Sequence, residues 1–219
     1  MHALCYMCFS EPVSWAALVA SWSGCAALAT VSPAWRAVAL FLAVVGGMQL
    51  WEALLWRHRA CTQTNATISK LGAVNNHAEP LAYFAACAAS VEPASRGLAF
   101  AAAFVTVACS ALLGKMTYDF WKRPVRDQCT VDRGDGLVWQ WNAHAGFTKP
   151  AYALFLASLL LTTYAYLPAG ANHMMAFAIA SSYAASYAIY RRKAMVGSMW
   201  CFYAALLPWL LFALNARSW

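Results

Sequence analysis

Long apolar runs separated by short polar stretches make up most of the chain. A helix needs about 20 mostly apolar residues to cross a bilayer, and seven runs approach that length: 12–30, 34–56, 70–91, 95–115, 150–167, 172–190 and 196–214. Prolines stand at several boundaries, where a missing N–H costs least: Pro12, Pro33, Pro93, Pro150 and Pro168. The pattern predicts an all-α polytopic membrane protein, a seven-transmembrane-helix bundle with residues 1–219 as one domain.

The one long polar segment, residues 116–149, connects the fourth predicted helix to the fifth. Arg133-Gly134-Asp135-Gly136 has the composition of a turn, and residues 137–141 after it predict a short strand or a segment at the membrane interface. No internal repeat is visible, so the sequence does not support an inverted-repeat transporter.

The composition agrees with lipid as the main solvent. Of the 219 residues, 63% are apolar and 11% are charged, and the mean hydropathy is +0.53. Soluble domains are nearer half apolar and a quarter charged. The bilayer is therefore the partner that the sequence predicts, and the helices leave no length for a separate soluble domain. Residues 1–10 show no basic region followed by an apolar core, so we expect no cleaved signal peptide.

The basic residues gather at one set of helix ends. If seven helices cross the membrane, one side (side A) holds the N-terminus, the turn after residue 56, the 116–149 connection and the turn after residue 190. The other side (side B) holds the remaining turns and the C-terminus. Side A then carries twelve Lys and Arg, and side B carries three: Arg36, Arg96 and Arg217. The positive-inside rule places side A and the N-terminus in the cytoplasm, or in the matrix or stroma of an organelle. The net charge of +7 thus reflects topology, and we expect no nucleic-acid partner.

Polar residues interrupt the second and third predicted helices. Ionisable groups at membrane depth are costly and usually mark functional sites. Glu52 lies about 8 Å inside the side-A end of its helix and Glu79 roughly 14 Å inside the next one, at 1.5 Å per residue. We expect these two carboxyl groups and His77 to meet in a cavity open to side A, with a neutral polar lining of Gln49, Asn75 and Asn76. Pro80 directly follows and predicts either a kinked helix or a helix that begins there.

Three interpretations of this cluster stay open. Glu52, His77 and Glu79 hold or relay a proton or small cation; or they bind a transition metal through oxygen and nitrogen ligands; or they only hydrogen-bond to one another and hold helices together. A bound metal ion is the cofactor that the second interpretation implies.

The eight cysteines divide into two groups. Cys25, Cys87 and Cys109 lie mid-helix and are interpreted as packing residues. Five others fall on or near side A: Cys5, Cys8, Cys61, Cys129 and Cys201. Cys5-Tyr6-Met7-Cys8 is the one Cys-X-X-Cys among them, and a single such pair is weak support for a zinc or redox motif. Thiols are expected on a cytoplasmic side, yet the glycosylation sequon Asn65-Ala66-Thr67 on the same side favours a lumenal one. We give the charge distribution more weight.

The start Met7-Cys8-Phe9-Ser10 resembles the Met-Cys-Trp/Phe-Ser opening of a family of uncharacterised multi-pass membrane proteins from bacteria, algae and large viruses. The resemblance continues, in order, at Glu52-Ala53-Leu54, at Cys61 with Asn65 and the segment ending in Pro80, at Cys129-Thr130-Val131 with the Trp-rich run after it, and at Met199-Trp200-Cys201.

In that family the segment before the proline is more apolar than residues 75–79 of this chain, so the polar cluster departs from the family pattern. The family has no activity to carry over. What the resemblance implies is the seven-span layout and an interest in Cys8, Cys61, Cys129 and Cys201. These four interfacial cysteines form disulfides, hold a metal, or stay unconnected.

We expect no retinal Schiff base, because no lysine lies inside a predicted span. The function that the sequence favours is a channel or transporter-like passage of protons or a small cation. The alternatives are a membrane metalloenzyme or redox enzyme using the same cluster, and a structural or accessory subunit of a membrane complex. The partner in the last case is a larger assembly or a second copy of the chain.

Overall fold

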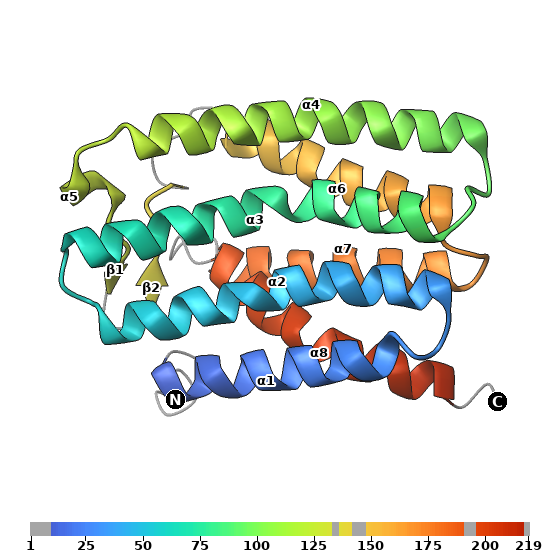
Figure 1. The fold of residues 1–219 in the computed structure, drawn as a ribbon, viewed down its shortest axis with the longest axis horizontal. Coiled ribbons are helices and arrows are strands. Elements are labelled where there is room, and N and C mark those ends of the chain that lie inside the picture. Colours follow the sequence, from blue (N-terminus) through green and yellow to red (C-terminus); the bar gives the residue numbers. More distant parts are fainter. Residues whose placement is uncertain (1–9, 133–135, 142–147, 191–195, 217–219) are drawn as a thin grey trace.

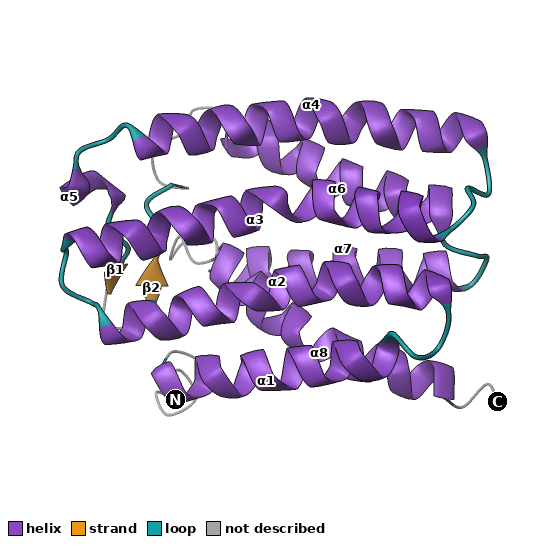
Figure 2. Ribbon diagram, viewed as in Figure 1, coloured by secondary structure: helices purple, strands orange, loops and turns teal. Residues whose placement is uncertain are grey.

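Helices make up nearly all of the structure, a computed structural model that describes residues 10–132, 136–141, 148–190 and 196–216 (Figure 2). The described residues form eight helices and one small hairpin. In chain order these are α1 (Glu11–Leu28), α2 (Pro33–Arg57), α3 (Gln63–Ser90), α4 (Arg96–Trp121), α5 (Val125–Gln128), β1 (Val131–Asp132), β2 (Leu137–Val138), α6 (Thr148–Tyr166), α7 (Ala171–Tyr190) and α8 (Val196–Ala216). The all-α prediction is confirmed, and the seven long helices correspond one to one to the seven predicted runs.

The long helices run alternately up and down in two layers (Figure 1). One layer is α1, α2, α3 and α4 in sequence order, and α6, α7 and α8 lie behind it. Helix α8 packs on α1 and α2, and α6 packs on α3 and α4. The N-terminal ends of α1, α3, α6 and α8 and the C-terminal ends of α2, α4 and α7 lie at one end of the bundle (left in Figure 1), which is side A as defined above.

Polar caps and prolines start the front helices. Ser32, Thr62 and Ser95 precede α2, α3 and α4, and each side-chain oxygen accepts a hydrogen bond from the backbone N–H three residues on. Such caps satisfy N–H groups that have no partner within the helix. Pro33 directly follows the N-cap residue Ser32, and its fixed φ suits the first turn of the helix.

Two predicted boundaries were wrong. Helix α3 begins at Gln63, seven residues before the predicted start, because the polar side chains of its first turns are buried against the chain that follows α4. Helix α4 continues to Trp121 rather than ending at 115, and an ion pair between Lys115 and Asp119 (2.6 Å) lies on its last turns. Helix α3 also runs through Pro80, so a helix that begins at this proline is ruled out.

The connection between α4 and α6 folds back over the side-A end of the bundle. Its hairpin pairs Val131 with Val138 in antiparallel register, and Gly136 (φ 151°) lies at the turn. The predicted short strand is thus present at residues 137–138. Trp139 and Trp141 follow it and are buried, with ring centroids 4.2 Å apart. We call residues 122–141 of this connection, where described, the cap.

Large apolar side chains cover the outside of the bundle as well as its core. Phe100, Phe104 and Phe177 expose 75%, 68% and 74% of their surface. By length and composition, two helices of the described chain, α2 and α4, could each cross a membrane. Helix α4 exposes most of its apolar residues, whereas α2 is largely buried by its neighbours.

Candidate functional site

The inner face of α3 carries a stripe of buried polar side chains. Asn76, Glu79 and Tyr83 recur at helical spacing and so share one face, and they are 4%, 0% and 0% exposed. This face looks toward α2 and α6. The burial of Glu79 and Asn76 agrees with the sequence prediction of polar groups deep in the protein.

Glu79 lies at the end of a short hydrogen-bonded chain. The Tyr152 hydroxyl of α6 donates to Asn76 Oδ1 (3.0 Å), and Asn76 Nδ2 donates to Glu79 Oε1 (3.4 Å). Glu79 Oε2 is buried and has no hydrogen-bond partner among the described residues. Tyr152 and Asn76, the two other members of this hydrogen-bonded chain, are uncharged. They therefore supply little to stabilise an ionised carboxylate at Glu79.

Glu52 and Cys201 lie beside this chain. The Cys201 thiol of α8 is fully buried and lies within electrostatic range of both Glu79 and Glu52. Glu52 and Gln49 are buried on the same face of α2, with 6% and 1% exposed. The Cys201 thiol thus lies within electrostatic range of both predicted carboxyl groups, one on α2 and one on α3.

One turn further toward side B, Tyr83 continues the polar stripe. Its ring stacks on Phe41 of α2 (centroids 4.5 Å apart), and its hydroxyl is 3.1 Å from Thr163 Oγ1 of α6. Thr163 in turn donates to the Leu159 carbonyl (2.8 Å). Polar contacts thus link α3 to α6 both at Asn76 and at Tyr83.

Asn75 and His77 point away from this stripe. Asn75 Nδ2 donates to the Val44 carbonyl of α2 (2.9 Å), which joins the two helices. His77 Nδ1 lies 2.6 Å from Thr117 Oγ1 of α4. His77 and Glu79 are two residues apart, and two residues turn a helix by about 200°, so they face opposite sides of α3.

Glu52, His77 and Glu79 therefore do not form one set of metal ligands. In the described part of the chain, no group of three or more His, Cys, Asp or Glu side chains is placed to hold a metal ion. This removes the geometric support for the metal interpretation of this cluster.

The side-A cysteines are only partly brought together. Cys61 and Cys129 form a disulfide, with Cα atoms 5.4 Å apart, which ties the start of α3 to the cap. Cys201, predicted near side A as a disulfide or metal partner, is instead a buried thiol inside the bundle. It lies five residues after the start of α8, at a fully buried position. Cys8 lies outside the described residues.

Asn65 of the sequon also joins the start of α3 to the cap, through hydrogen bonds to Thr130. Asn65 is 1% exposed, and both ends of its amide bond to other residues of the chain. No amide hydrogen points to solvent, so the folded protein does not present this asparagine as a glycan acceptor. The sequon therefore gives no support to a lumenal side A.

Sequence reasoning missed Tyr152 as a neighbour of the polar stripe, and Thr117 and Trp141 as neighbours of His77. Tyr152 follows Pro150 in an apolar helix start and Thr117 lies in what was predicted to be a loop. Only the packing of α6 and α4 against α3 reveals their roles.

Comparisons with known protein families, with characterised proteins and with solved structures found no match to this chain.

Proposed function

We propose that this chain is an integral membrane protein whose seven long helices all cross the bilayer. The long helices run alternately between side A and side B, and the side-A ends of α6, α7 and α8 lie short of those of α2 and α3 (Figure 1). The exposed apolar side chains of α4 and α7 support a lipid-facing exterior, since water-exposed surfaces rarely carry contiguous patches of this kind. Two helices meet the length and composition criteria on their own.

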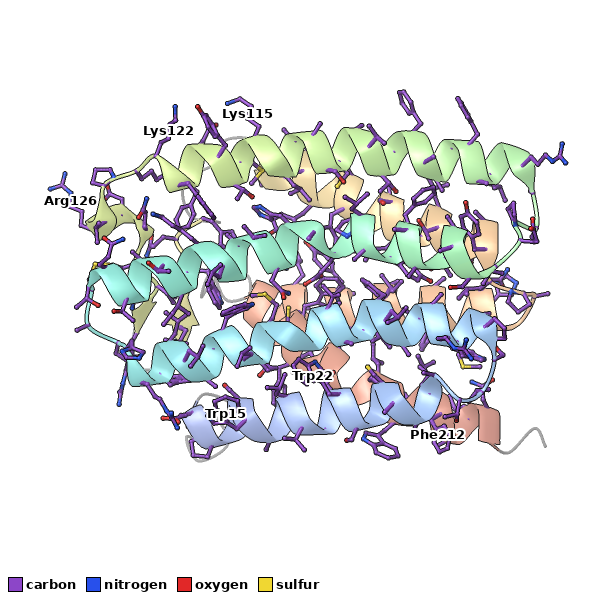
Figure 3. All side chains as sticks on the ribbon, viewed as in Figure 1. Trp15, Trp22, Lys115, Lys122, Arg126 and Phe212 are labelled. Carbon is purple, nitrogen blue, oxygen red and sulfur yellow. A yellow bond between two sulfur atoms is a disulfide. The ribbon has the colours of Figure 1, made fainter. Side chains whose placement is uncertain are left out.

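The proposed orientation has side A in the cytoplasm. Lys115, Lys122 and Arg126 project outward near that end of the bundle (Figure 3). Arg57 is the last residue of α2, Arg59 follows it before α3, and Lys70 lies seven residues after the start of α3. This excess of basic residues follows the positive-inside pattern. The Cys61–Cys129 disulfide favours the opposite orientation, because such bonds persist mainly in oxidising compartments.

The activity that we propose is transfer of protons, or passage of a small cation, along the inner face of α3. The observation that carries it is the chain Tyr152–Asn76–Glu79, with an enclosed carboxyl group at its end. Enclosed carboxyl groups whose neighbours can exchange hydrogen bonds are the usual carriers in proton relays across membranes. Glu52 and Cys201 extend the set of exchangeable groups between the helices.

Proton flux into proteoliposomes tests this proposal. The purified protein is reconstituted with a pH-sensitive dye inside the vesicles, and a potassium diffusion potential drives proton entry. We expect the double variant Glu52→Gln/Glu79→Gln to lose flux at least about tenfold, since a relay that depends on a titrating group fails without it. Glu92→Gln is the matched control, because Glu92 is an exposed carboxylate between α3 and α4. Flux that is unchanged in the double variant contradicts the proposal.

A further inference from the structure

A groove on the outside of the bundle, between α3 and α4, is separate from the inner stripe. It has a volume of about 380 Å³ and opens to the surface of the bundle. Its walls are mostly apolar, with Val74 and Leu81 from α3 and Tyr118 and Trp121 from α4. A largely apolar groove of this size with a few polar atoms is typical of a small-molecule site.

The polar atoms of the groove have no partner in the protein. His77 lines the groove and is only 6% exposed. Its Nε2 has no hydrogen-bond partner among the described residues. The Ser110 hydroxyl, which also lines the groove, is likewise buried and without a partner there. Unpaired buried polar atoms are costly, so a ligand that pairs with them gains binding free energy.

The hydrogen bonds of His77 assign the role of its free nitrogen. The Thr117 hydroxyl donates to the Leu113 carbonyl (2.9 Å), so its oxygen is left to accept from His77 Nδ1–H (2.6 Å). In a neutral imidazole the other nitrogen is then an acceptor. His77 Nε2 can therefore accept a hydrogen bond from an O–H or N–H group of a ligand. The Ser110 hydroxyl can donate a hydrogen bond to that same ligand group.

The charges at the side-A end of the groove indicate that this group is neutral. Lys70 lies over the Trp121 ring (5.8 Å) and Lys122 over the Tyr118 ring (4.3 Å). An anionic head group would stay with these two cations at the rim. His77 is seven residues further along α3 than Lys70, about 10 Å deeper, so the polar atoms there suit an uncharged hydroxyl.

We propose that this groove binds a lipid-soluble molecule with a neutral hydroxyl group, of the class of long-chain alcohols. The hydroxyl donates to His77 Nε2 and accepts from Ser110, and the apolar body lies along Val74 and Leu81. The site is independent of the proposed proton path, because His77 and Glu79 face opposite sides of α3.

Photolabelling of the full-length protein in lipid nanodiscs tests the site. The probes are hexadecanol carrying a diazirine and its methyl ether, which has the same body but no O–H. We expect the alcohol to label α3 and α4 peptides about three- to tenfold more than the ether, the range of one hydrogen bond. Equal labelling by the two probes overturns the proposal.

Two variants separate the groove from its polar atoms. Gly114 lines the groove, and nothing lies within 4 Å of a Cβ placed on it, so Gly114→Leu should occupy the groove and abolish labelling by both probes. His77→Phe keeps the volume and should remove only the preference for the alcohol. Ala108→Leu is the control, since Ala108 is exposed on α4 and does not line the groove. If His77→Phe fails to fold, the Gly114→Leu result and the wild-type probe ratio still decide, and undiminished labelling of Gly114→Leu contradicts the site.

Discussion

Asn65 uses both ends of its side-chain amide inside the folded chain. Its Nδ2 donates to the His58 carbonyl (2.8 Å) and the Thr130 carbonyl (3.1 Å), and its Oδ1 accepts from the Thr130 N–H (2.9 Å). The Ser69 hydroxyl adds a contact to the same oxygen (3.3 Å). One buried side chain thus joins the end of α2, the start of α3 and the cap.

We expect Asn65→Asp to destabilise the protein by about 2–4 kcal/mol, because the new oxygen faces two carbonyl groups in a buried site. The measurement is the denaturation midpoint in detergent micelles. Asn172→Asp is the matched control, since only the Oδ1 of Asn172 is used, as acceptor from the His173 N–H (2.7 Å), and aspartate keeps that acceptor. Equal midpoints for the two variants would show that the Asn65 bonds contribute little.

Gly72 and Gly114 make a second contrast at the scale of single residues. A Cβ on Gly72 would lie 2.6 and 2.8 Å from the Trp139 ring, whereas a Cβ on Gly114 meets nothing within 4 Å. We expect Gly72→Ala to destabilise by about 1–3 kcal/mol because a packed ring must move. Gly114→Ala should stabilise by about 0.5–1 kcal/mol through helix propensity. Thermal unfolding of both variants checks the opposite signs, and a stabilised Gly72→Ala variant would refute the packing argument.

The polar residues of α3 show which part of the site the sequence could predict. Their presence at depth followed from the sequence, because polar groups inside an apolar run stand out. Their directions depended on the helix continuing through Pro80: Asn75 then faces α2, His77 faces α4, and Glu79 faces the interior. The sequence alone did not decide whether the helix continues through Pro80, and the prediction therefore placed His77 and Glu79 in one cluster.

At the scale of elements, the cap is the part that apolar periodicity could not predict. Trp139 and Trp141 close the side-A end of the bundle, and Trp141 packs edge-on against both His77 and Phe120 (centroids 6.4 and 6.1 Å apart). The sequence predicted only a turn there, followed by a short strand or an interfacial segment. The connection is held down by buried aromatic rings, the Asn65 bonds and one disulfide, which are contacts between segments distant in sequence.

The disulfide should contribute measurably to the cap. Cys61 and Cys129 are 68 residues apart, and closing a loop of this length typically stabilises by about 2–4 kcal/mol. We expect Cys61→Ser, at the exposed end of the bond, to speed amide exchange at Thr130, Leu137 and Val138 and to leave exchange near Tyr83 unchanged. A reductant should act the same way on the wild type and have no further effect on the variant. Unchanged exchange at the cap would show that its other contacts suffice.

At the scale of the whole molecule, the order of the helices and their alternating direction followed from local signals. Apolar runs, prolines and capping residues are all short-range features. The pairing of α1 with α8 was not predictable in this way. It depends on a close approach at Gly24, where a Cβ would lie 2.8 Å from Trp209 and 2.9 Å from Pro208. A glycine within an apolar run does not indicate which helix packs against it.

The orientation of the whole molecule is where the basic residues and the disulfide disagree. We expect the charges to prevail, because orientation is set as the helices insert, by the Lys and Arg flanking them. Cys61 and Cys129 meet only after the cap has folded. A cytoplasmic side A then implies that these thiols are reduced in the cell and pair when the protein is purified in air.

Labelling of intact bacterial cells with an impermeant maleimide tests this orientation. In a background with Cys5, Cys8, Cys61 and Cys129 replaced by serine, one new cysteine is placed at Ala60 on side A or at Ala169 on side B, both exposed positions. We expect Ala169→Cys to react in intact cells and Ala60→Cys only after lysis, since the reagent does not cross the membrane. The reverse pattern would place side A outside, where the disulfide forms in the living cell, and would mean that the charge asymmetry does not set the topology of this protein.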